Sequence, residues 1–330
     1  MKKNIQSALL FVAIIAVFST CGQRPQAADN NQAQTVTESS IVADNQPVFS
    51  HVEIPEELTE LEEQAAFLVT HYWDNFDFSD VELIRTSHIV EQAFVNYLSI
   101  LPHTTREIAD ASIVAMLTKA IEEDPTGEMY AYFLNLYAMY LYDPNSPIRN
   151  EEFYITVTEF IISHPASDEM TRIRAEFDLS MMLKNRMGTV ATDFRYITIG
   201  GTRGSLHQLN RDFTIIYFHN PGCPACEEAK RQVRSSQIIN HLLNVGRLDI
   251  LAVYTDEDLD LWYQHQQQIP SFWINARDEP RIIRSRILYD LRAVPSFYLL
   301  DRDKIVLLKD ADVRTIELYL IGLEEARRRG

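Results

Sequence analysis

The uneven distribution of charge and glycine along the chain constrains its fold more than any other feature. The chain has 330 residues and a net charge of −17. Residues 51–187 contain 25 acidic and only 8 basic residues, so this stretch carries the whole charge excess. It holds a single glycine, Gly127, whereas seven glycines lie from Gly188 to Gly322. Since glycine punctuates turns and weakens helices, the contrast predicts an α+β, multidomain chain: an acidic all-helical domain over 55–187, then an α/β domain over 188–330.

Composition excludes several classes of protein. With 46% hydrophobic and 23% charged residues the chain is typical of a globular protein. No apolar run reaches the ~18 residues that span a bilayer, which excludes a polytopic membrane protein. The acidic balance provides no basic footprint, so we expect no nucleic-acid partner.

The helical domain is predicted from apolar residues at helical spacing. Thr104 and Glu107 have the spacing of a capping box. Six tyrosines or phenylalanines crowd the stretch 128–142, and we expect this stripe to be core and the acidic excess to be solvated surface. About six helices are expected, the first from Glu56 and others over 87–101, from 104 on, and over 128–142, 150–163 and 167–186. No catalytic or metal-ligating constellation is visible in this domain.

The N-terminus indicates export. Lys2 and Lys3 precede an apolar run over 8–18, and Cys21 follows it. This pattern resembles the lipobox of bacterial lipoproteins, although Thr20 stands where that family prefers a smaller residue. The resemblance implies a signal peptide over 1–20 and lipidation of Cys21, with an ordinary signal peptide cut nearby as the alternative. Residues 21–54 are polar and aperiodic, which predicts a flexible tether.

Beyond Gly188 the periodicity changes. Short β-rich apolar runs predict strands over 213–218, 248–254, 296–300 and 305–308. Helices are expected over 223–244 and 313–328. This order predicts a small sheet with helices on both faces.

A Cys-Pro-Ala-Cys motif, from Cys223 to Cys226, follows the first of these strands and opens a helix. The helix N-terminus favours thiolate at Cys223 and makes it a nucleophile. Cys226 lies one turn further on and can resolve a mixed disulfide. Pro224 suits the first helical turn. Structural zinc would need a second pair of ligands, which the sequence lacks, and a purely structural disulfide would close a loop too small to stabilise much.

The C-terminal 143 residues resemble a thioredoxin-fold domain of the TlpA/ResA-like, or alkyl-hydroperoxide-reductase-like, branch. The matching segments are 191–194, 200–206, the strand with Cys-Pro-Ala-Cys, and 294–301. The resemblance implies that Pro295 is a cis proline facing the dithiol and takes part in catalysis. It also implies that Val294, with Gly222 and Pro224, lines the substrate groove, and that no cofactor or metal is needed beyond the dithiol.

The sequence departs from that family at three positions. Gly222 replaces the usual Trp, Tyr217 replaces the buried acid of thioredoxin, and Ala229 stands where related reductases carry Glu. His219 lies four residues before Cys223, and one hypothesis is that its imidazolium lowers the pKa of that thiol; the alternative is a packed or exposed histidine without this role. A peroxiredoxin is excluded because its Thr and Pro positions hold Asn220 and Ile216.

Residues 71–76 and 141–147 resemble an uncharacterised helical domain that precedes thioredoxin-like domains in Gram-negative envelope lipoproteins. The chain is therefore expected to be a lipid-anchored, periplasm-facing thiol–disulfide oxidoreductase on the inner or the outer membrane. Its expected partners are envelope protein thiols and disulfides and an upstream electron donor or acceptor, and reduction is the expected direction. The alternative is a binding or scaffold lipoprotein whose thioredoxin-like domain does not turn over.

Overall fold

The structure is a computed structural model that describes residues 49–329, with gaps at 51, 86–87 and 280. All of the described residues fall within one compact unit, Pro47–Gly330. The predicted signal peptide, Cys21 and nearly all of the predicted tether lie outside the described residues. Among the helices that are described, none is long and apolar enough to cross a membrane.

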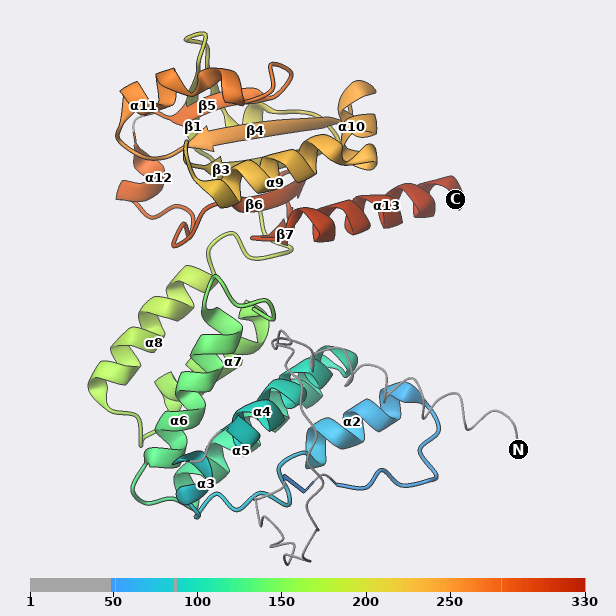
Figure 1. Ribbon diagram of the computed structural model, residues 1–330, viewed down its shortest axis with the longest axis vertical. Coiled ribbons are helices and arrows are strands. Elements are labelled where there is room, and N and C mark those ends of the chain that lie inside the picture. The colour runs from blue at the N-terminus through green and yellow to red at the C-terminus, as the bar shows by residue number, and fades with distance from the viewer. Residues whose placement is uncertain (1–48, 51, 86–87, 280, 330) are drawn as a thin grey trace, which may run out of the picture. The chain divides into compact units, whose positions relative to one another are not determined.

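The N-terminal part is helical, as the sequence predicts (Figure 1). Its helices are α2 (Leu61–His71), α3 (Glu82–Arg85), α4 (His88–Ile100), the short 3₁₀ helix η2 (Leu101–His103), α5 (Arg106–Glu122), α6 (Glu128–Tyr137), η3 (Ala138–Tyr142), α7 (Glu151–Ser163) and α8 (Glu169–Met182).

Three local predictions in this part differ from the structure. The first helix, α2, begins at Leu61 rather than at Glu56, because the backbone is still extended at its N-cap, Glu60. The N-cap of α5 is Thr105 rather than Thr104, because Thr105 has the extended backbone and its hydroxyl accepts the Ile108 N–H. The expected aromatic helix over 128–142 is α-helical only to Tyr137. Its last five residues form a π-turn, η3, in which the Asp143 N–H donates to the Ala138 carbonyl.

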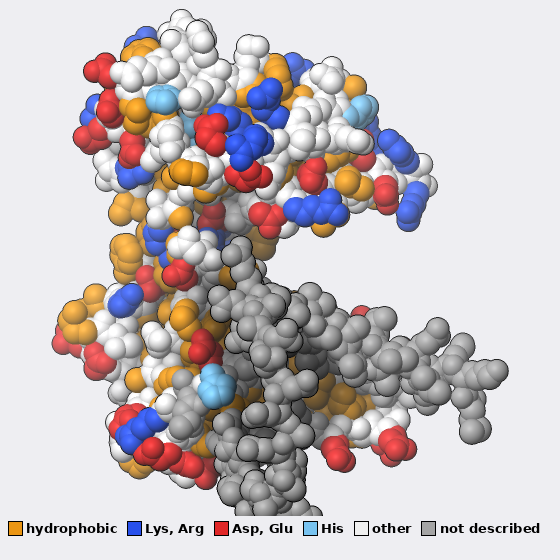
Figure 2. Space-filling model, viewed as in Figure 1, with side chains coloured by type: hydrophobic (Ala, Val, Ile, Leu, Met, Phe, Trp, Pro, Cys, Tyr) orange, Lys and Arg blue, Asp and Glu red, His pale blue; other side chains and the backbone are white. Residues whose placement is uncertain are grey.

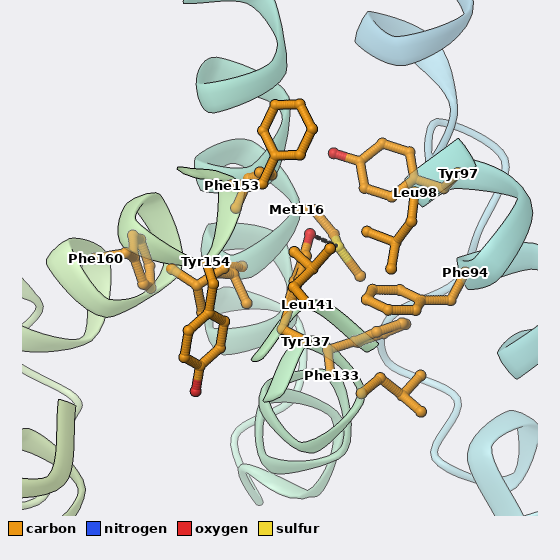
Figure 3. Packing of buried hydrophobic residues seen from close by; sticks show 14 of the residues in the cluster. Phe94, Tyr97, Leu98, Met116, Phe133, Tyr137, Leu141, Phe153, Tyr154 and Phe160 are labelled. Atoms are coloured by element: carbon orange, nitrogen blue, oxygen red, sulfur yellow. Dashed lines mark hydrogen bonds between the residues drawn. The ribbon is translucent and has the colours of Figure 1, made fainter. Parts of the chain in front are cut away.

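The aromatic stripe of α6 is core, as expected (Figure 3). Phe133 and Tyr137 are fully buried, and Phe94 of α4 packs edge-on against Tyr137. The Tyr137 hydroxyl donates to the Met116 Sδ of α5 at 3.0 Å, so its polar end is satisfied inside the core. Figure 2 shows acidic side chains of the helical part at several separate places on the visible surface rather than gathered in one patch.

The C-terminal part contains a seven-stranded mixed sheet in the order β2-β1-β5-β4-β3-β6-β7. The strands are β1 (Arg195–Thr198), β2 (Arg203–Ser205), β3 (Phe213–His219), β4 (Leu248–Tyr254), β5 (Ile274–Asp278), β6 (Ser296–Asp301) and β7 (Val306–Lys309). Its helices are the 3₁₀ turn η4 (Leu206–Gln208), α9 (Pro224–Ser235), α10 (Gln237–Asn244), α11 (Leu259–Gln264), the 3₁₀ turn η5 (Gln266–Gln268), α12 (Ile282–Ser285) and α13 (Val313–Arg329).

β3 is an inner strand of this sheet, next to the central strand β4, and the Cys-Pro-Ala-Cys motif follows its C-terminal end (Figure 1). It pairs in parallel with β4 and antiparallel with β6. Ile215 and Tyr217 face the core beneath α9, α10 and α13, whereas Ile216 and Phe218 face the opposite core. Burial on both faces explains why this strand is largely apolar rather than alternating between apolar and polar residues.

Two features of the sheet domain differ from the prediction. β1, β2 and β5 were not expected, and β2 lies within the segment 200–206, which served only as part of the family resemblance. The single helix expected over 223–244 is interrupted at Ser236, where the backbone is extended. The Ser236 hydroxyl accepts the Ile239 N–H and caps α10 as a new helix.

Candidate active site

The dithiol lies where β3 meets α9. Cys223 is the N-cap of α9, and Gly222 before it has the positive φ of 74° that favours glycine in this turn. Cys223 is half-buried and Cys226 is only 1% exposed. The two cysteines therefore differ in access to solvent, although they are three residues apart.

The Cys223 sulfur caps the first turn of α9. The Cys226 N–H donates to Cys223 Sγ at 3.2 Å. Pro224 occupies the first helical position, where its missing N–H costs nothing. The Cys223 sulfur therefore lies at the N-terminal end of the α9 dipole and accepts a backbone hydrogen bond there.

The loop before β6 completes this arrangement. The peptide bond between Val294 and Pro295 is cis, as the sequence resemblance implies. The Cys223 thiol points at the Val294 carbonyl oxygen, 3.9 Å away. The structure thus brings Gly222, Cys223, Pro224 and Cys226 together with the Val294–Pro295 segment, although some 70 residues separate the two in sequence.

Cys226 is held as a thiol. Burial, followed by the hydrogen bond with Cys223, raises the pKa of Cys226 to about 12. To act as a resolving nucleophile it must therefore pass its proton to an acceptor at the moment of attack.

Tyr217 occupies the position of the buried acid of thioredoxin and cannot serve as that acceptor. Its hydroxyl donates to the Cys226 carbonyl at 2.7 Å. Its ring stacks between His219 and Phe297, with centroid distances of 4.9 and 4.7 Å. Burial holds the pKa of Tyr217 far above its usual range, so its role is to fix the first turn of α9.

Of the two hypotheses for His219, the structure favours a packed histidine over an imidazolium that tunes Cys223. His219 is 5% exposed, and burial, followed by the charge of Lys230, lowers its pKa to about 3. The ring is therefore neutral at physiological pH and supplies no positive charge to Cys223.

A charged pair beside the dithiol was missed in the sequence. Lys230 of α9 is 5% exposed, and its Nζ lies 2.7 Å from the carboxylate of Glu227. Both residues line a small pocket that His219 also borders. After burial and the contact with Cys223, the Glu227 charge also contributes to the raised pKa of Cys226. Their spacing of three in a helix was the available signal, but only the fold shows that Lys230 is buried.

Among the residues that the structure describes, no group of three His, Cys, Asp or Glu side chains could hold a metal ion.

Comparison with known proteins identifies both parts of the chain. Residues 20–185 match the family model described as domain of unknown function DUF5106. The whole arrangement resembles a crystal structure of a thioredoxin-like protein from Bacteroides caccae, with 41% identity and a TM-score of 0.80. That match covers 84% of this chain and 99% of the other, and a TM-score so near the covered fraction requires both domains to superpose together.

Two further structures match the C-terminal part alone. The C-terminal domain of an uncharacterized protein from Bacteroides fragilis is 41% identical, covering 42% of this chain and 99% of that one, with a TM-score of 0.41. The thioredoxin domain of a thiol–disulfide oxidoreductase from Bacteroides vulgatus is 19% identical, covering 41% and 97%, with a TM-score of 0.36. No curated protein matches the chain. With half of its length matched by the family model and a two-domain relative at 41% identity, the chain belongs to the DUF5106 family, as a member that carries a thioredoxin-like domain after the helical one.

Proposed function

We propose that the protein is a thiol–disulfide oxidoreductase that reduces disulfides of protein substrates. The Cys223 thiolate attacks one sulfur of a substrate disulfide, forms a mixed disulfide and releases the other substrate sulfur as a thiolate. Cys226 then gives up its proton and attacks Cys223 Sγ, which releases the second substrate thiolate. Two electrons pass to the substrate, and the Cys223–Cys226 disulfide formed is reduced again by an upstream donor dithiol.

The observation that carries this proposal is the asymmetry of the two cysteines. Cys223 is accessible, receives a backbone N–H and faces the Val294 carbonyl, whereas Cys226 is buried one turn deeper. A nucleophile needs access and thiolate stabilisation, and a resolving thiol needs protection from solvent and a position next to the first sulfur. The resemblance of the sequence to the TlpA/ResA-like branch supports the same roles.

Glu227 is the proposed proton acceptor for Cys226, held in place by Lys230. In a Glu227→Gln variant we expect resolution of the mixed disulfide to slow and its pH dependence to change. Glu228→Gln is the matched control, since Glu228 is an exposed neighbour paired with Arg231. Equal rates and pH profiles in the two variants would assign proton transfer to another group.

We further propose that the protein acts in the bacterial cell envelope, anchored by a lipid on Cys21 and facing the periplasm. The charged start, the apolar run and Cys21 support export and lipidation. Its substrates and its electron donor would then be envelope proteins. Labelling cells with a fatty-acid analogue, with Cys21→Ser as control, tests the anchor, and unlabelled wild-type protein would rule it out.

The decisive experiment is the reduction potential of the dithiol, measured by equilibration with thiol buffers. A value at or below about −230 mV supports a reductase, and a value above about −180 mV an oxidant or isomerase. In parallel, a Cys226→Ser variant should accumulate mixed disulfides with envelope proteins through Cys223. If the dithiol cannot be oxidised and reduced again, and Cys226→Ser accumulates no mixed disulfide, the enzyme proposal fails. A scaffold protein that binds partners without turnover is then favoured.

A further inference from the structure

The helical part holds the loop that carries the cis proline. Arg292 lies in the irregular segment between α12 and β6, three residues before Pro295. Its guanidinium carbon lies 3.7 Å from the ring centroid of Tyr142, and its Nη1 donates to the Tyr142 carbonyl at 3.4 Å. Tyr142 belongs to η3 and stacks in turn on Tyr154 of α7, with centroids 4.8 Å apart.

Glu151, at the start of α7, adds a charged contact to the same arginine. One carboxylate oxygen lies 3.5 Å from Arg292 Nη2, and the other lies 2.8 Å from Lys309 Nζ of β7. The side chains of Glu151 and Lys309 are only 11% and 7% exposed. On the sheet domain itself, Asp290 accepts from Arg292 at 2.8 Å. Residues of both the helical part and the sheet domain therefore hold the Arg292 guanidinium.

Hydrogen bonds of Asn185 hold the beginning of the same loop. The buried Asn185 follows α8 and donates its amide to the Leu288 carbonyl at 2.8 Å. Its side-chain oxygen accepts the Thr192 N–H at 2.7 Å. Leu288 and Arg292 thus anchor the loop at two points before it reaches Val294.

Such contacts select one conformation of the loop rather than only adding binding energy between the two domains. A buried ion pair repays its desolvation only when its geometry is good, and removing one partner leaves a buried charge uncompensated. Stacking of a guanidinium on an aromatic ring is likewise restrictive, because it fixes the plane of the group. The loop conformation that satisfies Tyr142, Glu151 and Asn185 is therefore strongly preferred.

We propose that Arg292 is a positioning residue through which the helical domain holds the Val294–Pro295 segment over Cys223 for protein substrates. This inference rests on the proposed function, since it gives the helical domain a part in disulfide exchange. Val294 offers the backbone beside the Cys223 sulfur, and a shift of the loop would misplace any polypeptide paired with it. A small disulfide that makes no contact with the loop would be unaffected.

The test compares Tyr142→Leu and Arg292→Gln with wild type. Tyr142→Leu leaves the sheet domain unchanged, and Arg292→Gln leaves the helical domain unchanged. Arg247→Gln is the matched control, because Arg247 is similarly half-buried and pairs with Asp212 and Glu324 away from the loop. Reduction of insulin, a protein disulfide, is measured beside reduction of cystamine, a small one.

We expect both test variants to reduce insulin about tenfold more slowly in kcat/KM, with cystamine reduction and the control unchanged. Hydrogen exchange of the amides of Leu288 and Arg292, which bond to the Ile283 carbonyl and to Asp290, should accelerate in Tyr142→Leu and not in the control. Unchanged insulin kinetics in an active protein would overturn the proposal, as would unchanged exchange of these amides. If the wild type reduces neither disulfide, the proposed function fails instead, and hydrogen exchange still decides whether the helical domain holds the loop.

Discussion

The difference between the two thiols leads to a prediction about alkylation of the reduced protein. With a pKa of about 12, Cys226 is ionised at pH 8 to a fraction of only ~10⁻⁴. An ordinary cysteine with a pKa of ~8.5 is ionised to about a quarter at that pH. Thiolate content alone therefore slows alkylation of Cys226 by about three orders of magnitude relative to a free cysteine, and burial slows it further.

The assay is a time course with iodoacetamide at pH 8, followed by fragmentation mass spectrometry that separates the two sites. We expect Cys223 to be labelled first and Cys226 to remain free long after Cys223 is consumed. In Cys223→Ser, Cys226 should still react slowly, because burial is the largest cause of its raised pKa. In concentrated guanidinium chloride both sites should react alike. Labelling of Cys226 within about tenfold of the Cys223 rate in the native protein would refute the assigned roles.

Three further predictions concern stability. Phe133→Ala should lower the free energy of unfolding by about 3–5 kcal/mol in a denaturant titration, because it empties part of the helical core, whereas exposed Met170→Ala should change it by less than ~0.5 kcal/mol. His219 has a folded pKa of about 3, below its unfolded value of ~6.5, so the unfolded chain gains a proton first and stability falls as pH drops through this window. His219→Phe should flatten that fall, and an unchanged pH profile would disprove the neutral, buried ring. Gly204→Ala should lower the melting temperature, because its Cβ would lie 2.7 Å from the ring of Tyr196, and an unaltered melting curve would show that this ring moves freely.

Elements with a strong local signal could be predicted from the sequence. β4 was predicted with its observed bounds because Leu248–Tyr254 is apolar at every position except Asp249 and is buried on both faces. The dithiol and the cis Val294–Pro295 bond were found from a motif and a resemblance. β5, Ile274–Asp278, was missed because it contains Asn275, Arg277 and Asp278, whose polarity hides a strand that is formed by its pairing with β4 and β1.

The remaining features depend on contacts distant in sequence. The charge state of His219 follows from burial that no spacing reveals. In the sequence, Lys230 and Glu227 have the spacing of an ordinary surface ion pair on a helix. Only the structure shows that the Lys230 ammonium is buried. Arg292 meets Tyr142 across 150 residues, and nothing near either residue marks the other.

The π-turn at the end of α6 has a consequence for the register of the chain. A π-turn accommodates one residue more than an α-turn, so the positions after it are rotated relative to a regular helix. Tyr142 is the last residue of that turn, and its ring and carbonyl both meet Arg292. An uninterrupted α-helix of the same composition would direct this tyrosine elsewhere. The local winding of one helix thus determines which residue lies at the junction between the two domains, and the cis-proline loop depends on it.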